Sequence, residues 1–152
     1  GAQAGSPPPP AAPAQRPAVV TRAQNELMAS CRESGGRPSL VQGFQTTVDL
    51  NGDGQPDYIL DATNLNCEGA ASALCGSAGC PLQVFLSGPR GYAAAFGSNV
   101  QGWEVEQGNP PVLRTDLHGS FCGRVGSEAC VKRLRTSRLA ASVSLFAAST
   151  SE

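Results

Sequence analysis

The chain has 152 residues, of which 40% are hydrophobic and 15% charged, and its formal net charge at pH 7 is -1. This length fits one ordinary domain, and no apolar run approaches the roughly 18 residues that a membrane-spanning helix needs. The near-neutral charge argues against a nucleic-acid partner, because proteins that bind nucleic acids usually carry a strongly basic face.

The first part of the chain, residues 1–18, is rich in proline and alanine and contains four consecutive prolines at 7–10. Such a segment favours an extended, solvated conformation and cannot build a core. We therefore expect a disordered leader over 1–18, which could tether the domain or bind a proline-recognising partner. The segment Ala2-Gln3-Ala4 has the small-x-small form of a signal-peptidase site, which indicates that a signal peptide has been removed.

Residues 17–34 carry a helical pattern. Apolar residues recur there at spacings of three and four along one face: Val20, Ala23, Leu27 and Cys31. Thr21 and Gln24 have the spacing of a capping box, and glycines at 35 and 36 provide a stop signal. We expect one helix here, with Cys31 on the buried face and in position to attach the helix to the rest of the chain.

After Pro38 the signals change to short β-branched or alternating runs separated by Gly/Pro turns, which predict strands. The expected strands are 44–48, 58–60, 82–86, 92–96, 102–106, 112–115 and 131–135, with a last one around 143–146 unless that tail frays. This order predicts an α+β fold in which an N-terminal helix packs on an antiparallel β meander stabilised by disulfides. A single domain is expected over 19–147, followed by a disordered tail over 148–152.

The chain contains six cysteines: Cys31, Cys67, Cys75, Cys80, Cys122 and Cys130. An even number of cysteines in a small, Gly-rich chain favours a disulfide framework, and so a secreted or periplasmic protein. A zinc site is the alternative, but only the 75–80 spacer reaches the usual zinc spacing and the chain has one histidine. Proximity and the glycines inside the spacers favour the pairs 75–80 and 122–130, which leaves 31 with 67, one of 15 connectivities.

The segment 49–57 carries the clearest chemical pattern. Oxygen-bearing side chains stand at loop positions 1, 3, 5 and 9: Asp49, Asn51, Asp53 and Asp57. Ca²⁺ takes six to eight oxygen ligands, and a loop that winds around one point offers it every second residue. Gly54 permits a left-handed turn that would direct the carbonyl of Gln55 inward. The alternative is a plain hairpin turn, since Asn-Gly and Asp-Gly both favour turns.

This loop resembles the calcium loops of FG-GAP repeats and of EF-hands. The resemblance implies Ca²⁺ binding by the side chains of Asp49, Asn51, Asp53 and Asp57 and by the carbonyl of Gln55. Position 12 is Leu60, so the bidentate glutamate of a helical EF-hand is missing, and the apolar run at 58–60 suits entry into a strand, as in the FG-GAP form. One loop cannot make a propeller. The CGSxGC and HGxxCG segments are also similar to small exported bacterial proteins of uncharacterised function.

Charge is distributed unevenly along the chain. No Lys or Arg lies between Arg37 and Arg90, whereas that stretch has five acidic residues, and 114–138 has six basic residues against two acidic ones. The basic segment is interpreted as a solvated strand face that partly balances the acidic half, with an anionic envelope polymer as the alternative partner.

The only histidine, His118, stands near Ser120 and Cys122 and invites comparison with a nucleophile–base pair. We favour a structured turn in which His118 bonds the backbone, because Cys122 is better explained by a bridge to Cys130. Trp103 alternates with Glu104 and Glu106, and we interpret it as a core residue beside an exposed acidic strand face.

These expectations combine into one functional hypothesis: a secreted or periplasmic, non-enzymatic module with a structural Ca²⁺ loop that binds an envelope polymer or another secreted protein. Two alternatives stay open. The first is an inhibitor of a secreted hydrolase that presents the rigid loop 76–79, and the second is a small hydrolase that uses His118.

Overall fold

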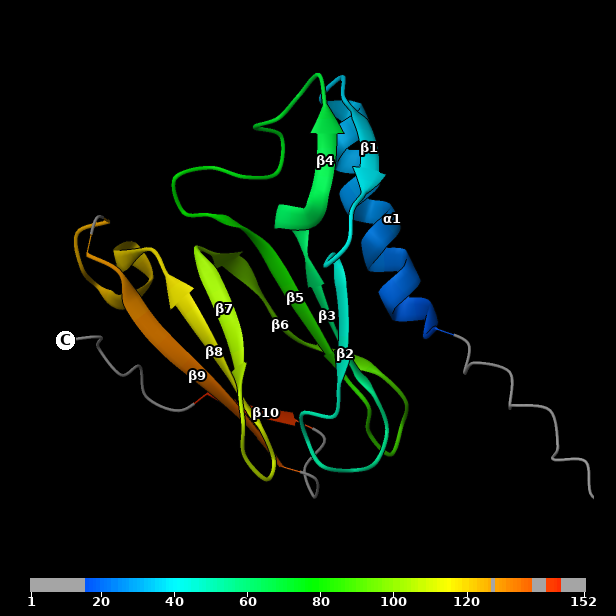
Figure 1. The fold of residues 1–152 in the computed structure, drawn as a ribbon, viewed down its shortest axis with the longest axis vertical. Helices are drawn as coiled ribbons and strands as arrows, with labels where there is room; N and C mark the ends of the chain where they lie inside the picture. Colours follow the sequence, from blue (N-terminus) through cyan, green and yellow to red (C-terminus); the bar gives the residue numbers. More distant parts are fainter. Residues whose placement is uncertain (1–15, 127, 138–141, 146–152) are drawn as a thin grey trace, which may run out of the picture.

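The structure is a computed structural model that describes residues 16–126, 128–137 and 142–145. Most of the expected leader and the whole of the expected tail at 148–152 lie outside these ranges. Figure 1 shows the elements in chain order: α1 (Ala18–Glu33), β1 (Arg37–Leu40), β2 (Gln45–Val48), β3 (Asp57–Asp61), η1 (Ala62–Asn64), β4 (Leu65–Glu68), β5 (Cys80–Leu86), β6 (Ala93–Val100), β7 (Gly102–Glu106), β8 (Val112–Leu117), η2 (Gly119–Cys122), β9 (Cys130–Ser137) and β10 (Ser142–Leu145).

All of these strands pair antiparallel, and they fall into three sheets. A central sheet has the order β2-β3-β5-β6, a second sheet has the order β10-β9-β8-β7, and β1 pairs with β4 in a separate ribbon. In Figure 1 the helix and the β1–β4 ribbon lie on one side of the central sheet and the second sheet lies on the other. The expected α+β class with an N-terminal helix is confirmed, but the division between three sheets was not predicted.

Helix α1 buries the four residues that its periodicity indicated, which are Val20, Ala23, Leu27 and Cys31. The expected capping box is wrong. Pro17 is the N-cap and makes no side-chain cap bond. Thr21 and Gln24 lie inside the helix, where both accept hydrogen bonds from the side chain of Arg16. Arg16, assigned to the leader from its sequence, therefore contacts the domain.

The hydrophobic core has two parts, one on each side of the central sheet. Strand β3 is buried along its whole length because both of its faces are covered. Leu60 packs with α1 in one cluster, and its neighbour Ile59 packs with the second sheet in the other. Alternating residues of a strand point to opposite faces, so one strand supplies both clusters.

Three disulfides join the cysteines in the favoured pairs. Cys31–Cys67 attaches α1 to β4 inside the helix-side cluster, with 5.7 Å between the Cα atoms. Cys75–Cys80 closes a short loop before β5, and Cys122–Cys130 attaches η2 to β9. No described cysteine is free. Within the described ranges, no helix has the length and apolar character needed to cross a bilayer.

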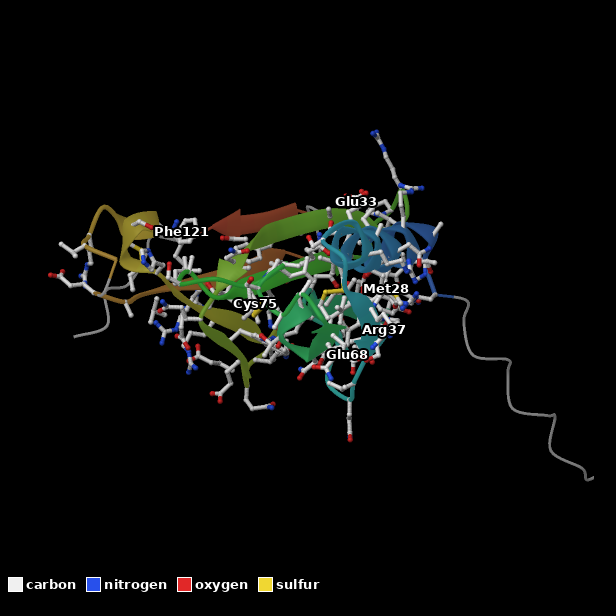
Figure 2. All side chains as sticks on the ribbon, turned by 90° about the horizontal axis from the view of Figure 1, so that it is seen from above. Met28, Glu33, Arg37, Glu68, Cys75 and Phe121 are labelled. Carbon is white, nitrogen blue, oxygen red and sulfur yellow. A yellow bond between two sulfur atoms is a disulfide. The ribbon has the colours of Figure 1, made fainter. Side chains whose placement is uncertain are left out.

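The β1–β4 ribbon was not predicted. Strand β1 is largely exposed and includes Pro38, so its sequence shows no strand periodicity. Strand β4 alternates buried and exposed residues, with Leu65 and Cys67 inward. Arg37 and Glu68 face each other across the ribbon and form an exposed ion pair, visible near the helix in Figure 2.

Candidate metal centre

The loop 49–57 connects β2 to β3 at one end of the central sheet. Gly52 and Gly54 have φ angles of 72° and 85°, so both adopt the left-handed conformation that favours glycine. A side chain at Gly54 would meet no atom within 4 Å, so its conformation and not lack of space calls for glycine there. The left-handed turn expected at Gly54 is confirmed.

The start of the loop is fixed in the protein interior. Leu50 is 2% exposed and packs between the two larger sheets, and its carbonyl accepts a hydrogen bond from Thr136 of β9. Asn51 is equally buried, and its Nδ2 donates to the carbonyl of Ser87 at 2.8 Å. The loop is therefore held by both neighbouring sheets.

Asp57 is fully buried and is surrounded by hydrogen-bond donors. Its Oδ2 accepts from the N–H groups of Leu50 and Asn51 at 2.6 and 3.3 Å. Its Oδ1 accepts from the N–H and the hydroxyl of Ser87 at 2.8 and 2.9 Å. An ionised carboxylate has about four acceptor positions, so the three N–H donors and the neighbouring Ser87 hydroxyl leave Asp57 little capacity for a further ligand.

The other oxygen-bearing side chains keep spare capacity. Asp49 accepts three N–H bonds, from Gly52, Asp53 and Gly54, with the last alone on Oδ2. Asn51 Oδ1 accepts one N–H bond from Asp53 at 3.3 Å. Asp53 is exposed, and each of its oxygens has one donor, the N–H of Gln55 and the hydroxyl of Ser87.

The carboxylates of Asp53 and Asp57 share one hydroxyl group, that of Ser87. Its hydroxyl oxygen lies 2.6 Å from Asp53 Oδ2 and 2.9 Å from Asp57 Oδ1, but a hydroxyl has only one hydrogen to donate. Burial raises the pKa of Asp57 above its ordinary value, despite the opposing hydrogen bonds from Ser87, Leu50 and Asn51. Desolvation also raises the pKa of Asp53, but the hydrogen bonds from Ser87 and the Gln55 N–H outweigh it, and the net shift is downward.

The fit to a cation is therefore partial. Among the described residues, no group of three or more His, Cys, Asp or Glu side chains is arranged to hold a metal. The oxygens with free acceptor positions belong to Asp49, Asn51 and Asp53, and the ion pairs in the described part of the chain include none of the loop carboxylates. Asp57 would have to give up a hydrogen bond to become a ligand.

Two residues of this region were not anticipated from the sequence. Ser87 follows β5 and contacts the loop across 30 residues of chain. The hydroxyl of Tyr92 donates to the Pro56 carbonyl at 2.6 Å, and its ring packs edge-on against Tyr58. Burial raises the pKa of Tyr92. Contacts of this range depend on which strands pair, which no local pattern in the sequence reveals.

The side chain of His118 caps the start of the short helix η2. His118 is the N-cap of η2, and its Nδ1 lies 2.7 Å from the Ser120 hydroxyl and accepts from the Ser120 N–H. Gly126 lies so close to the other edge of the ring that a side chain there would collide with it. Cys122 is bridged to Cys130, as expected.

Two basic residues of β8 and β9 pair with acidic residues of the second sheet. Arg114 pairs with Glu104 and Asp116, and Arg133 pairs with Glu106 at 2.9 Å. The outer face of this sheet is therefore a mixed-charge surface.

Trp103 packs against the core between the sheets, and its indole N–H donates to Asp61 at 2.8 Å.

No protein family, curated protein or solved structure matches the chain.

Proposed function

We propose that this chain is an exported, disulfide-stabilised binding module whose loop 49–57 holds a structural Ca²⁺. The observation that carries the proposal is the pair of carboxylates, Asp53 and Asp57, that share a single Ser87 hydroxyl without a cationic side chain. A divalent cation would balance this charge, and Ca²⁺ prefers the carboxylate, amide and carbonyl oxygens that the loop supplies.

The proposed ligands are Asp49, Asn51, Asp53 and the carbonyl of Gln55. Asp57 would hold the end of the loop in place through its hydrogen bonds with Ser87. It would become a ligand only if it exchanged one of its hydrogen bonds for the ion. The loop leads directly into β3 and has no helix after it, so the ion would stabilise the fold and would not open a helix pair. Extracellular calcium modules bind with Kd values of roughly 10⁻⁴–10⁻³ M, and we expect this range.

Calorimetric titration with Ca²⁺ tests the site. Asp53→Asn removes one charge from an exposed side chain without changing its shape, and it should abolish most of the binding heat. Glu33→Gln removes one charge at the exposed last position of α1 and should leave the heat unchanged. In Figure 1 this end of α1 lies at the opposite end of the domain from the loop between β2 and β3. Equal heats in the parent protein and in Asp53→Asn would reject the site.

The export part of the proposal is supported by the three disulfides, since such bridges persist mainly in oxidising compartments. We propose an envelope polymer or another exported protein as the partner. Recovery from envelope extracts by the immobilised protein, compared with an unrelated disulfide-bonded protein, measures this role.

A hydrolase inhibitor is the second candidate, and one observation favours it. Gly76 and Gly79 exchange two backbone hydrogen bonds of 3.0 Å, and the Cys75–Cys80 bridge closes the same hairpin. Gln101 also donates to the Ser77 carbonyl at 3.2 Å. A tip held at three points suits insertion into a rigid cleft, because little ordering entropy is lost on binding. Inhibition assays against secreted hydrolases, repeated with Ser77→Arg, test this candidate.

A further inference from the structure

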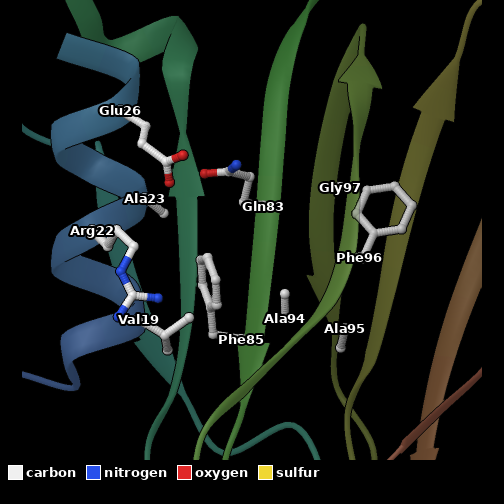
Figure 3. Close-up of a pocket in the computed structure, with 10 residues that line it drawn as sticks. All are labelled: Val19, Arg22, Ala23, Glu26, Gln83, Phe85, Ala94, Ala95, Phe96 and Gly97. Carbon is white, nitrogen blue, oxygen red and sulfur yellow. The ribbon is translucent and has the colours of Figure 1, made fainter. Parts of the chain in front are cut away.

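A groove runs between α1 and the outer part of the central sheet. It lies between residues of α1 and residues of β5 and β6, and it has a volume of about 450 Å³. Figure 3 shows the residues that line it: Val19, Arg22, Ala23, Glu26, Gln83, Phe85, Ala94, Ala95, Phe96 and Gly97. This volume lies in the range of small-molecule sites.

The helix side of the groove carries two charges of opposite sign. Arg22 and Glu26 are four residues apart on α1, so they share a face of the helix, with their Cβ atoms about 5–6 Å apart. Neither forms an ion pair with another described residue. Figure 3 shows both side chains at the groove. The rim therefore offers one free cation and one free anion.

The sheet side carries a buried acceptor without a donor. Gln83 Oε1 is buried and has no hydrogen-bond partner, the only such side-chain atom among the described residues. In Figure 3 this oxygen points toward the carboxylate of Glu26. Two acceptors that face each other leave a position that a donor would satisfy, and a positively charged donor would satisfy it best.

The floor between these polar groups is apolar and partly open. Phe85 of β5 is 3% exposed and pairs with Ala94 of β6, and Gln83 pairs with Gly97. Small residues at 94 and 97 leave the surface beside the Phe85 ring free of large side chains. An apolar group placed there would be removed from water on burial.

We propose that this groove binds a small zwitterion that combines an ammonium, a carboxylate and an apolar side chain. The ammonium lies between Glu26 and Gln83 Oε1, and the carboxylate faces Arg22. The apolar part rests on the exposed surface of Ala94 and Gly97, beside the buried Phe85. An apolar amino acid and a short apolar peptide share this chemistry. The site is separate from loop 49–57, so it stands or falls independently of the calcium proposal.

Calorimetric titration of the full chain tests the proposal with two probes, L-leucine and the dipeptide Leu-Leu. Binding of leucine assigns a free amino acid, and binding of the dipeptide alone assigns a peptide. N-acetyl-leucine lacks the ammonium and leucine amide lacks the carboxylate, so both should bind at least tenfold more weakly than leucine. If neither zwitterion binds, or if the capped probes bind equally well, the proposal is overturned.

Charge-removing variants locate the site on the helix. Glu26→Gln and Arg22→Gln should each weaken binding of the zwitterion at least tenfold. Their matched controls, Glu33→Gln and Arg32→Gln, remove the same charges from exposed positions near the end of α1 and should leave the affinity unchanged. Equal weakening by the control variants would overturn the proposal.

Gln83→Leu separates a binding role from a structural one. Leucine removes the unsatisfied acceptor and keeps the side chain close in size, so the variant should unfold at a higher temperature than the parent. The same variant should bind the zwitterion at least tenfold more weakly. A variant that is more stable and binds as well as the parent would overturn the assignment of Gln83 to the site.

Discussion

The buried carboxylate of Asp57 and the buried Oε1 atom of the half-buried Gln83 both belong to the central sheet, but their hydrogen bonding differs. Three N–H groups donate to the carboxylate of Asp57 and the Ser87 hydroxyl lies within hydrogen-bond distance, whereas Gln83 Oε1 has no donor. A buried polar group with hydrogen-bond partners stabilises a fold, whereas a buried acceptor without a donor costs about 1–3 kcal/mol of folding free energy. For this reason we propose that Asp57 fixes the conformation of loop 49–57 and that Gln83 binds a ligand.

Gly79 is a residue whose replacement should be costly. Its φ is +99°, and a Cβ atom there would collide with the carbonyl of Val100. We predict that Gly79→Ala lowers the free energy of unfolding by at least about 2 kcal/mol, measured by urea denaturation. Gly76→Ala, in the same hairpin but with open space around it, should cost much less. Similar losses in the two variants would contradict this explanation.

The ion pair between Glu106 and Arg133 predicts a pH dependence. The hydrogen bond from Arg133 lowers the pKa of Glu106 below its ordinary 4.5. A carboxylate with a lowered folded-state pKa contributes stability that is complete above the unfolded-state pKa and is lost as the pH falls through the folded-state value. Glu106→Gln should therefore be slightly less stable than the parent near neutral pH, and the difference should disappear in acid. A difference that persists unchanged below pH 4.5 would contradict the assignment.

The ligand types of the candidate loop were predictable from the sequence because they follow one another in the chain. The left-handed turn at Gly54 follows from the same local pattern. The role of Ser87 was not predictable, because Ser87 meets Asp57 only when β5 pairs with β3. The exposed Asp53 and the fully buried Asp57 also look alike in the sequence, although only Asp53 retains acceptor positions.

At the scale of elements, the bridge between α1 and β4 should contribute most among the disulfides. Cys31 and Cys67 are 36 residues apart, against 5 and 8 for the other two pairs. In the chain-entropy model, loops of these lengths contribute about 4, 2 and 2.5 kcal/mol. We predict that Cys31→Ala/Cys67→Ala destabilises the protein more than Cys75→Ala/Cys80→Ala does. Urea denaturation of both double variants measures the difference, and the reverse order would contradict the prediction.

Most strands were predictable because alternation or β-branching marks them. Strand β7 spans the expected 102–106, and β5, β6, β8 and β9 extend past their expected ends. The ribbon of β1 and β4 was missed because β1 contains Pro38 and shows no strand periodicity, while the alternation of Leu65 and Cys67 was available as a signal in β4. The predicted capping box is wrong because the helix begins at Ala18, before Thr21.

At the scale of the whole molecule, the fold is three layers with a small core on each side of the central sheet. The assignment of strands to sheets was not predictable, because alternation shows that a residue is buried but not in which core. Ile59 and Leu60 are adjacent and equally apolar, yet they belong to opposite clusters. One bridge and the candidate calcium loop lie where the layers meet: Cys31–Cys67 is in the helix-side cluster, and Leu50 anchors the loop between the sheets.

We propose that the disulfides and a bound Ca²⁺ together give this small domain its rigidity. Thermal unfolding of the full chain with Ca²⁺ or chelator, each with and without reductant, tests this claim directly. We predict that Ca²⁺ at tenfold excess over its Kd raises Tm by about 4 °C and that reduction lowers Tm by a larger amount. A Tm that is the same under all four conditions would contradict the claim.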